Sequence, residues 1–210
     1  PSQPLKPRHK YQHIYAPLTY TLMTWKWLLQ KDFMQVINFG SSDLFKAKDQ
    51  SLGMVWTKLI VGKGFHIGVF YILPLVMGID WKMILVGNMI MHVIAGFILS
   101  LTFQMAHVVD KAEFLTEDEA KENSLLEHQL KTTANFSTKS ALVTWYTGGL
   151  NFQVEHHLFP TINHIHYPKI AEIVRKTAEE FNLPYNEYKT LLSAVKGHFS
   201  HLKNMGMSPA

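Results

Sequence analysis

The stretch MILVGNMIMHVIAGFILSLTFQMAHVV, residues 83–109, decides which fold this chain can form. It contains no Asp, Glu, Lys or Arg, and it is longer than the about 20 apolar residues that a helix needs to cross a bilayer core. A second uncharged run, FHIGVFYILPLVMGI at 65–79, precedes it across the short link DWK, and residues 61–64 extend this run. We therefore expect a membrane helical hairpin, with helices over 61–79 and 83–107.

The lysines predict the orientation of this hairpin. Because the link is short, the two helices must run antiparallel and their outer ends must face the same side of the membrane. Five lysines flank those ends, and the positive-inside rule makes that side cytoplasmic: Lys46, Lys48, Lys58, Lys63 and Lys111. An integral membrane protein with a cytoplasmic site is expected, in the plasma membrane of a bacterium or the endoplasmic reticulum of a eukaryote. A soluble helical hairpin is the alternative.

Composition agrees with a membrane protein and excludes other classes. Apolar residues make up 47% of the 210 residues and charged residues 17%, whereas soluble domains carry about 25% charged residues. The net charge of +4 comes from scattered basic residues, so we expect no nucleic-acid partner. Cysteine is absent, so any metal must be held by His, Asp, Glu or amide groups. The Pro-rich basic start, PSQPLKPRHKYQH, suggests the C-terminal part of a longer protein.

The remaining segments also read as helical, which makes the predicted fold class all-α. Residues 14–33 carry Trp and Lys among apolar residues and predict an interfacial helix. From Asp110 the chain turns polar, and we expect a cytoplasmic helical cap over 110–205. Its helices are predicted at 116–136 (with Thr116 and Glu119 as a capping box), 138–158 (interrupted at Gly148–Gly149), 167–184 and 185–197.

The cap contains the second informative stretch, GGLNFQVEHHLFPTINHIHYPKI at 148–170. On a helix, spacings of three and four bring Gln153 close to both His156 and His157. Neutral imidazole suits Fe, Zn, Cu and Ni, and an amide oxygen is a weaker ligand. His107, at the end of the long apolar run, is a further candidate because ionisable groups at membrane depth are usually functional. The zinc-peptidase pattern HExxH is absent from this stretch.

Two carboxylates accompany these groups. Glu155 lies within the histidine stretch and Asp110 follows the apolar run. Either could be a ligand or a partner to an imidazole N–H, and for Asp110 a solvated surface charge is the favoured interpretation. His92, in the middle of the apolar run, is expected to hydrogen-bond within the helix bundle and not to bind metal.

The segment GGLNFQVEHHLFP closely resembles the third histidine box of membrane fatty acid desaturases. Its QxxHH form is similar to that of the front-end type, which includes delta-5, delta-6 and sphingolipid delta-8 desaturases. The segments HKYQHIYAPLTY, FQMAHVVD, EHQLKTTANFS and HYPKIAEIV resemble other parts of the same family, so the likeness extends over nearly the whole chain.

This resemblance implies an enzyme that uses O2, two electrons and two iron ions to introduce a cis double bond into an acyl chain. His156 and His157 match iron ligands, Gln153 stands where other desaturases have a ligand histidine, and His107 matches an additional histidine. His164 and His166 follow the box and are candidate partners of the ligands. The implied partners are a fatty acyl-CoA or acyl-lipid substrate, an electron donor of cytochrome b5 or ferredoxin type, and the lipid bilayer.

An acyl substrate also requires an apolar tunnel, for which Trp145, Tyr146 and Phe152 are candidates, with ordinary core packing as the alternative. The segment HKYQHIYAPLTY resembles the connector that follows the family's second box, so the resemblance implies that the first two boxes, of HxxxH and HxxHH type, are missing here and that the chain is inactive alone. The alternatives are a related di-iron hydroxylase, ketolase or acetylenase, and a non-catalytic membrane metal-binding protein.

Overall fold

The computed structural model describes residues 5–40, 42, 51–115 and 124–207, and these residues are mostly helical, as the sequence predicts. They fall into two units, which are treated separately: Leu18–Leu99 forms one, and Pro1–Pro17 with Ser100–Ala210 forms the other. Lys46, Lys48 and the predicted capping pair Thr116 and Glu119 lie outside the described residues.

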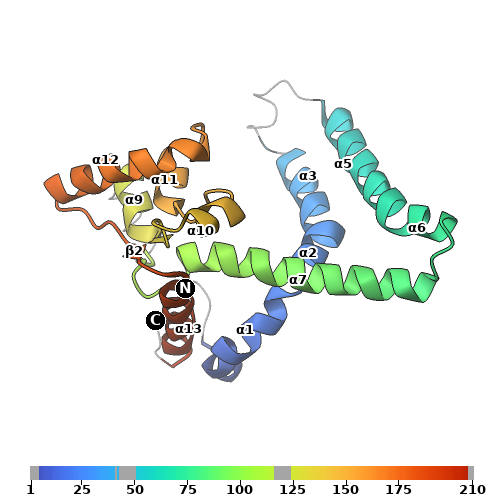
Figure 1. The fold of residues 1–210 in the computed structure, drawn as a ribbon, viewed down its shortest axis with the longest axis horizontal. Helices are drawn as coiled ribbons and strands as arrows, with labels where there is room; N and C mark the ends of the chain where they lie inside the picture. Colours follow the sequence, from blue (N-terminus) through green and yellow to red (C-terminus); the bar gives the residue numbers. More distant parts are fainter. Residues whose placement is uncertain (1–4, 41, 43–50, 116–123, 208–210) are drawn as a thin grey trace. The chain divides into compact units, whose positions relative to one another are not determined.

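The unit 18–99 consists of helices (Figure 1). After the end of α1 (Gln12–Tyr20) come α2 (Met23–Lys26), the π-helical turn η2 (Trp27–Lys31) and α3 (Asp32–Gly40). They are followed by α5 (Leu52–Ile67), the π-helical turn η3 (Gly68–Ile72), α6 (Leu73–Val76) and the first part of α7 (Trp81–His107). Helix α3 packs against α5, where the Lys63 ammonium lies 2.5 Å from an Asp32 carboxylate oxygen.

Two helical stretches of the chain are long and apolar enough to cross a membrane. Leu52–Val76 has 25 residues and a mean hydropathy of 1.8, and Trp81–His107 has 27 residues and a mean hydropathy of 2.1. In the most apolar part of the first stretch none of the residues is buried, and in that of the second 28% are. Both predicted apolar runs are therefore helical, and the helix that contains the first run begins at Leu52.

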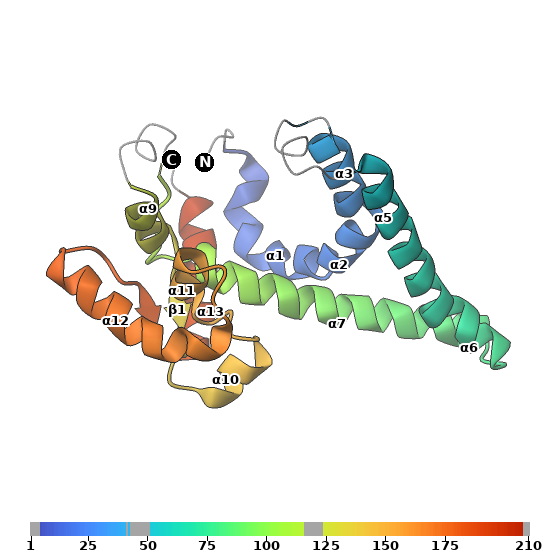
Figure 2. The same cartoon turned by 90° about the horizontal axis from the view of Figure 1, so that it is seen from above.

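A tight turn joins these two stretches. Gly78 adopts a positive φ of 85°, the amide of Ile79 donates to the carbonyl of Pro74 at 3.0 Å, and the Asp80 carboxylate accepts from the amide of Lys82 at 2.8 Å. From this turn α6 and α7 diverge (Figures 1 and 2). The angle between them holds an apolar groove of about 420 Å³.

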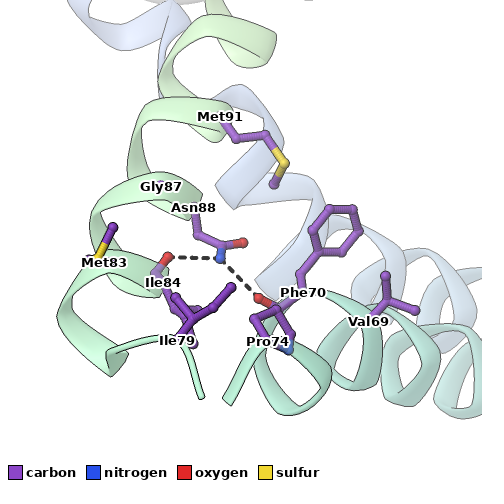
Figure 3. Close-up of a pocket in the computed structure, with 9 residues that line it drawn as sticks. All are labelled: Val69, Phe70, Pro74, Ile79, Met83, Ile84, Gly87, Asn88 and Met91. Atoms are coloured by element: carbon purple, nitrogen blue, oxygen red, sulfur yellow. Dashed lines mark hydrogen bonds between the residues drawn. The ribbon is translucent and has the colours of Figure 1, made fainter. Parts of the chain in front are cut away.

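Asn88 is the polar residue of this groove (Figure 3). Its side-chain amide donates to the carbonyl of Ile84 at 2.9 Å and to that of Phe70, in the π-helical turn, at 3.1 Å. The groove lies between Phe70 and Pro74 on one side and Met83 and Met91 on the other. One amide therefore ties α7 to the preceding helix close to the turn.

On α7 the buried His92 forms a second polar contact within this unit. Its Nδ1 lies 3.1 Å from the hydroxyl of Thr24, and this hydroxyl donates to the His92 carbonyl at 3.0 Å. The expectation that His92 hydrogen-bonds between helices is confirmed.

The other unit combines short helices with one two-stranded pairing. It contains η1 (Pro7–Tyr11), the start of α1, the end of α7, α9 (Leu125–Thr132), β1 (Asn135–Phe136), α10 (Ala141–Tyr146), α11 (Gln153–Leu158), η4 (His164–His166), α12 (Tyr167–Glu180), β2 (Glu187–Tyr188) and α13 (Leu191–Met205). The strands are parallel, with Asn135 opposite Glu187 and Phe136 opposite Tyr188. Phe136 and Tyr188 belong to a core cluster with Met105, Ala106, Val109, Ala112, Ala134 and Ala194.

Several predicted helix boundaries in this unit are wrong. A strand occupies 135–136, where the predicted helix 116–136 would have ended, and the capping box at the start of α9 is formed by Ser124 and Glu127. The predicted helix 185–197 begins only at Leu191, because Tyr188 is drawn into the parallel pairing with Phe136. Leu191 and Leu192, in the first turn of α13, are exposed.

The core position of Phe136 predicts a large stability effect. Its side chain is 0% exposed, so Phe136→Ala should cost about 3–5 kcal/mol of unfolding free energy through lost burial and the remaining cavity. Phe181→Ala is the matched control because Phe181 is 70% exposed. Thermal unfolding in detergent micelles checks this, and equal melting temperatures for the two variants would contradict the assigned core.

Buried His198 predicts a pH dependence of stability. Its Nδ1 lies 2.6 Å from the carbonyl of Val108, and burial lowers the pKa of its imidazole. The unfolded chain therefore takes up a proton first as the pH falls below about 6.5, so stability is full above that pH and decreases below it. His198→Gln should flatten this decrease, whereas His164→Gln, at an exposed position, should leave it unchanged. Melting temperatures measured between pH 5 and 8 test the difference.

Candidate metal centre

The histidine stretch reaches its position through a sharp turn at two glycines. Gly148 and Gly149 both adopt positive φ, 60° and 82°, and the Gly149 amide donates to the carbonyl of Thr144 at 2.9 Å. The amide of Phe152 then donates to the carbonyl of Gly149 at 3.0 Å, and α11 begins at Gln153. This turn interrupts the predicted helix 138–158, so that α10 and α11 are separate helices.

Three of the predicted ligands meet at one point. The Gln153 amide nitrogen lies 2.9 Å from Nε2 of His157, one helical turn further on, and 3.1 Å from Nε2 of His107 at the end of α7. The rings of His107 and His157 meet edge to face, with centroids 5.0 Å apart. The structure thus brings together side chains separated by 46 positions in the sequence.

The fourth predicted ligand, His156, lies beside this group. Its ring centroid is 5.8 Å from that of His157, and its Nδ1 is 3.3 Å from the hydroxyl of Tyr167 at the start of α12. Tyr167 is buried with Phe152 and Ala171. A hydrogen bond from a metal-binding imidazole to a second residue fixes the orientation of the ring, and Tyr167 can provide that bond for His156.

Burial keeps His157 in the form that binds metals. Desolvation, together with smaller effects of the neighbouring imidazoles of His107 and His156, lowers its pKa to about 4. The imidazole is therefore neutral near pH 7, with a lone pair available to a cation.

Gln153 supplies an unused acceptor at the same point. The residue is 3% exposed, and its Oε1 is buried without a hydrogen-bond partner within the described part of the chain. Rotating the amide by a half-turn exchanges its oxygen and nitrogen without a change of shape. The oxygen would then face the Nε2 atoms of His107 and His157. Two neutral imidazoles and an amide oxygen form a donor set that fits a transition-metal ion.

These residues offer fewer ligands than a complete metal site would need. Across the described ranges, no group of three or more His, Asp and Glu side chains is arranged to hold a metal ion. The convergence here consists of two imidazoles and an amide, with His156 alongside. A two-iron centre requires more ligands than these four residues provide.

The carboxylates and the other histidines lie apart from this convergence. Glu155 is fully buried and accepts hydrogen bonds from Asn135 and Tyr185. Asp110 is at the surface and accepts a hydrogen bond from the Tyr188 hydroxyl. His164 and His166 are exposed in η4, where the Cβ of His164 faces Gly149.

Of the three candidate tunnel residues, one is buried and two are exposed. Phe152 is buried in the core cluster with Tyr167 and Ala171. Trp145, at 78% exposure, and Tyr146 lie on the surface of α10. In this structure Phe152 therefore packs in the core, and the two residues of α10 leave an aromatic surface uncovered.

Comparison with known proteins identifies the family. The model of the fatty acid desaturase family matches residues 1–189. The chain belongs to the fatty acid desaturase family. Its relatives confirm the front-end resemblance, and they include the sn-1 linoleoyl-lipid 6-desaturase of Arthrospira platensis, which is 33% identical over 100% of this chain and 56% of the relative. The acyl-lipid (8-3)-desaturase of Physcomitrium patens is 35% identical over 99% of this chain and 43% of the relative.

The Delta(5) fatty acid desaturase A of Dictyostelium discoideum is 32% identical over 96% of this chain and 44% of its own length. The chain thus spans about half the length of the curated desaturases that it matches. No solved structure matches it significantly.

Three residues around the centre of this desaturase chain were not predicted from the sequence. Asn135 and Tyr185 bind Glu155, and Tyr167 contacts His156. Nothing in their local sequence marks them, since each reaches the box only through tertiary packing. The buried Glu155 was the available signal, because a carboxylate inside a core must find hydrogen-bond donors.

Substitutions of Gly148 and Gly149 should lower the stability of the protein by different amounts. Gly148→Ala should cost about 1–2 kcal/mol, because a side chain is strained at positive φ. Gly149→Ala should cost about 1–3 kcal/mol more through overpacking, because its new Cβ would lie 2.5 Å from the Cβ of His164, whereas at Gly148 nothing lies within 4 Å. Thermal unfolding of both variants tests this difference, and equal melting temperatures would contradict the close packing at Gly149.

Proposed function

We propose that this chain is the C-terminal part of a front-end acyl desaturase that binds two iron ions and uses O2 to introduce a cis double bond into an acyl chain. The observation that carries the proposal is the convergence of His107 and His157 on Gln153, with His156 alongside. Family membership and the names of the relatives support the reaction class.

The iron ions, when bound, supply the oxidising power that an unactivated C–H bond requires. The reaction removes two hydrogen atoms, which together are two protons and two electrons, from the acyl chain, and it takes two further electrons from a donor of cytochrome b5 or ferredoxin type. With two protons from solvent, O2 becomes two molecules of water.

The chain's own residues hold and orient the metal. His107, His156 and His157 would ligate it as neutral imidazoles, and Gln153 would offer its amide oxygen from the position of a histidine in other desaturases. The hydroxyl of Tyr167 orients the ring of His156. Burial of Gln153 and the low pKa of His157 favour a metal over a proton at this point.

The membrane arrangement is part of the same proposal. Segments 61–79 and 83–107 would form the membrane hairpin, 14–33 would lie at the interface, and 110–205 would form the cytoplasmic cap. The length, hydropathy and exposure of the two apolar helices support the hairpin. His107 ends the second helix, so the metal would lie at that end of the helix.

An acyl-lipid is the proposed substrate, in preference to an acyl-CoA. Two of the similar enzymes are named for acyl-lipid or linoleoyl-lipid substrates. A lipid-borne chain would reach the metal from the bilayer, and Trp145 and Tyr146 offer exposed aromatic surface on α10 for such contact.

The test uses the complete natural protein that contains this chain, expressed in a host that lacks the product. Loss of a residue that only orients a metal ligand reduces metal affinity or activity about 10- to 100-fold. His157→Ala and His107→Ala each remove a proposed ligand, so each should reduce new unsaturation by more than that. Gas chromatography of fatty acid esters and iron content per polypeptide measure the two effects. The control is His9→Ala, because His9 bonds within its own turn, to the Lys6 amide.

Unchanged unsaturation in His157→Ala would contradict the proposed ligand set. Hydroxylated products in place of unsaturated ones would indicate the related hydroxylase. A wild-type protein that contains no iron would indicate that the reaction class is wrong.

A further inference from the structure

Glu155 occupies a place in the histidine box that its neighbours do not explain. It lies between Gln153 and the histidine pair, it is 0% exposed, and its carboxylate points to residues outside the box. Oε2 accepts from the side-chain amide of Asn135 at 2.8 Å, and Oε1 accepts from the hydroxyl of Tyr185 at 2.9 Å. A buried acidic side chain persists only when such donors replace water.

These bonds form a closed set, which we call the Glu155 network: Glu155, Asn135 and Tyr185. The amide nitrogen of Asn135 also lies 2.8 Å from the hydroxyl of Tyr185. The amide oxygen of Asn135 accepts from the backbone amide of Val154 at 2.9 Å, in the first turn of α11. Every hydrogen-bonding atom of the Asn135 side chain is thus used, and Glu155 must accept at both oxygens.

The network is attached to the rest of the unit on two sides. Asn135 belongs to β1, which pairs with β2. The ring of Tyr185 lies under the guanidinium of Arg175, 5.0 Å from its carbon, and Arg175 in turn lies 2.5 Å from a carboxylate oxygen of Glu187 in β2. We call β1, β2 and α12 the platform of α11, because they hold in place the residues that bind Glu155.

Helix geometry places the network behind the metal site. At about 100° per residue, Gln153 and His157 share one face of α11, and Glu155 lies on the opposite face. A rotation of the helix about its axis would move Glu155 off its donors and turn Gln153 and His157 away from His107. The two faces are therefore coupled.

We propose that Glu155 is a positioning residue: its hydrogen bonds to Asn135 and Tyr185 fix the rotation of α11 and so aim Gln153 and His157 at His107. This role rests on the proposed metal site and differs from the ligand or imidazole-partner roles that the sequence suggested for Glu155. The residue acts through the helix and does not touch the metal.

The test compares variants of the complete protein after iron loading. In Glu155→Gln one carboxylate oxygen becomes an NH2 donor, so in either orientation of the new amide one of the two donors, Asn135 or the Tyr185 hydroxyl, loses its acceptor. We expect about 10- to 100-fold weaker iron binding, with a matching decrease in kcat and an unchanged KM for the acyl substrate. Glu172→Gln is the control because Glu172 lies exposed on α12.

The second variant reverses the hydrogen-bond polarity. In Asn135→Asp combined with Glu155→Gln, the new carboxylate accepts from Val154 and from the new amide. We expect this double variant to recover most of the iron binding and kcat lost in the single one. Tyr185→Phe removes one hydrogen bond to Glu155 without adding a donor, so it should cause an intermediate loss of iron binding and kcat. This variant still tests the inference if Glu155→Gln folds poorly.

Wild-type iron binding and kcat in Glu155→Gln would overturn the inference, as would a folded double variant no better than the single one. A loss of melting temperature in Glu155→Gln with full iron content in the folded fraction would also overturn it, since that pattern indicates stability alone. These outcomes leave the proposed function intact, whereas a wild-type protein without iron would remove both.

Discussion

The hydrogen bonds of the buried Glu155 carboxylate join three segments of its unit that are far apart in the sequence. Burial of a charge is unfavourable unless donors replace the lost water, and burial raises the pKa of this carboxyl even though Asn135 and Tyr185 bond to it. Those donors come from segments 20 and 30 positions away. Satisfying one carboxylate therefore requires β1, α11 and the approach to β2 to come together.

The histidine helix depends on this constraint because it is short. α11 has six residues, fewer than an isolated helix needs to be stable in water. Its orientation must therefore come from its neighbours, which are the platform behind it and the core residues Val154 and Phe152 on its flanks. The pairing of Gln153 and His157 on one face is local, but the direction of that face is set by tertiary contacts.

The unit 18–99 combines a large exposed apolar surface with a small number of hydrogen bonds between its helices. Its helices leave much apolar surface exposed, and polar contacts such as Asn88 with Phe70 and His92 with Thr24 join them. In the proposed bilayer setting lipid would cover the apolar surface, and these few hydrogen bonds would keep their specificity because nothing else nearby can compete for them. Because lipid would cover the apolar side chains and these hydrogen bonds satisfy the polar ones, the otherwise apolar helix α7 can contain buried polar residues.

Sequence patterns predicted the elements whose signal is periodic and long. The long uncharged run that forms α7 and the helix predicted at 167–184, which corresponds to α12, are two such elements. The strand at Asn135–Phe136 and the extended Tyr188 were missed, because two residues carry no periodicity and their pairing joins positions 52 apart. Within the candidate site, the sequence predicted the spacing of Gln153, His156 and His157 and singled out His107 at the end of α7. It did not predict that Asn135, Tyr167 and Tyr185 contribute.

The sequence by itself determined the helical class, the two apolar helices, the glycine turn and the family signature, because each of these depends on residues close together in the chain. Only the tertiary structure decided that His107 meets Gln153 and His157, and that Glu155 turns away from the histidines toward Asn135 and Tyr185. The physical reason is that a buried carboxylate and a short helix have no preferred orientation of their own. Their surroundings, assembled from distant segments, supply the hydrogen bonds that select one.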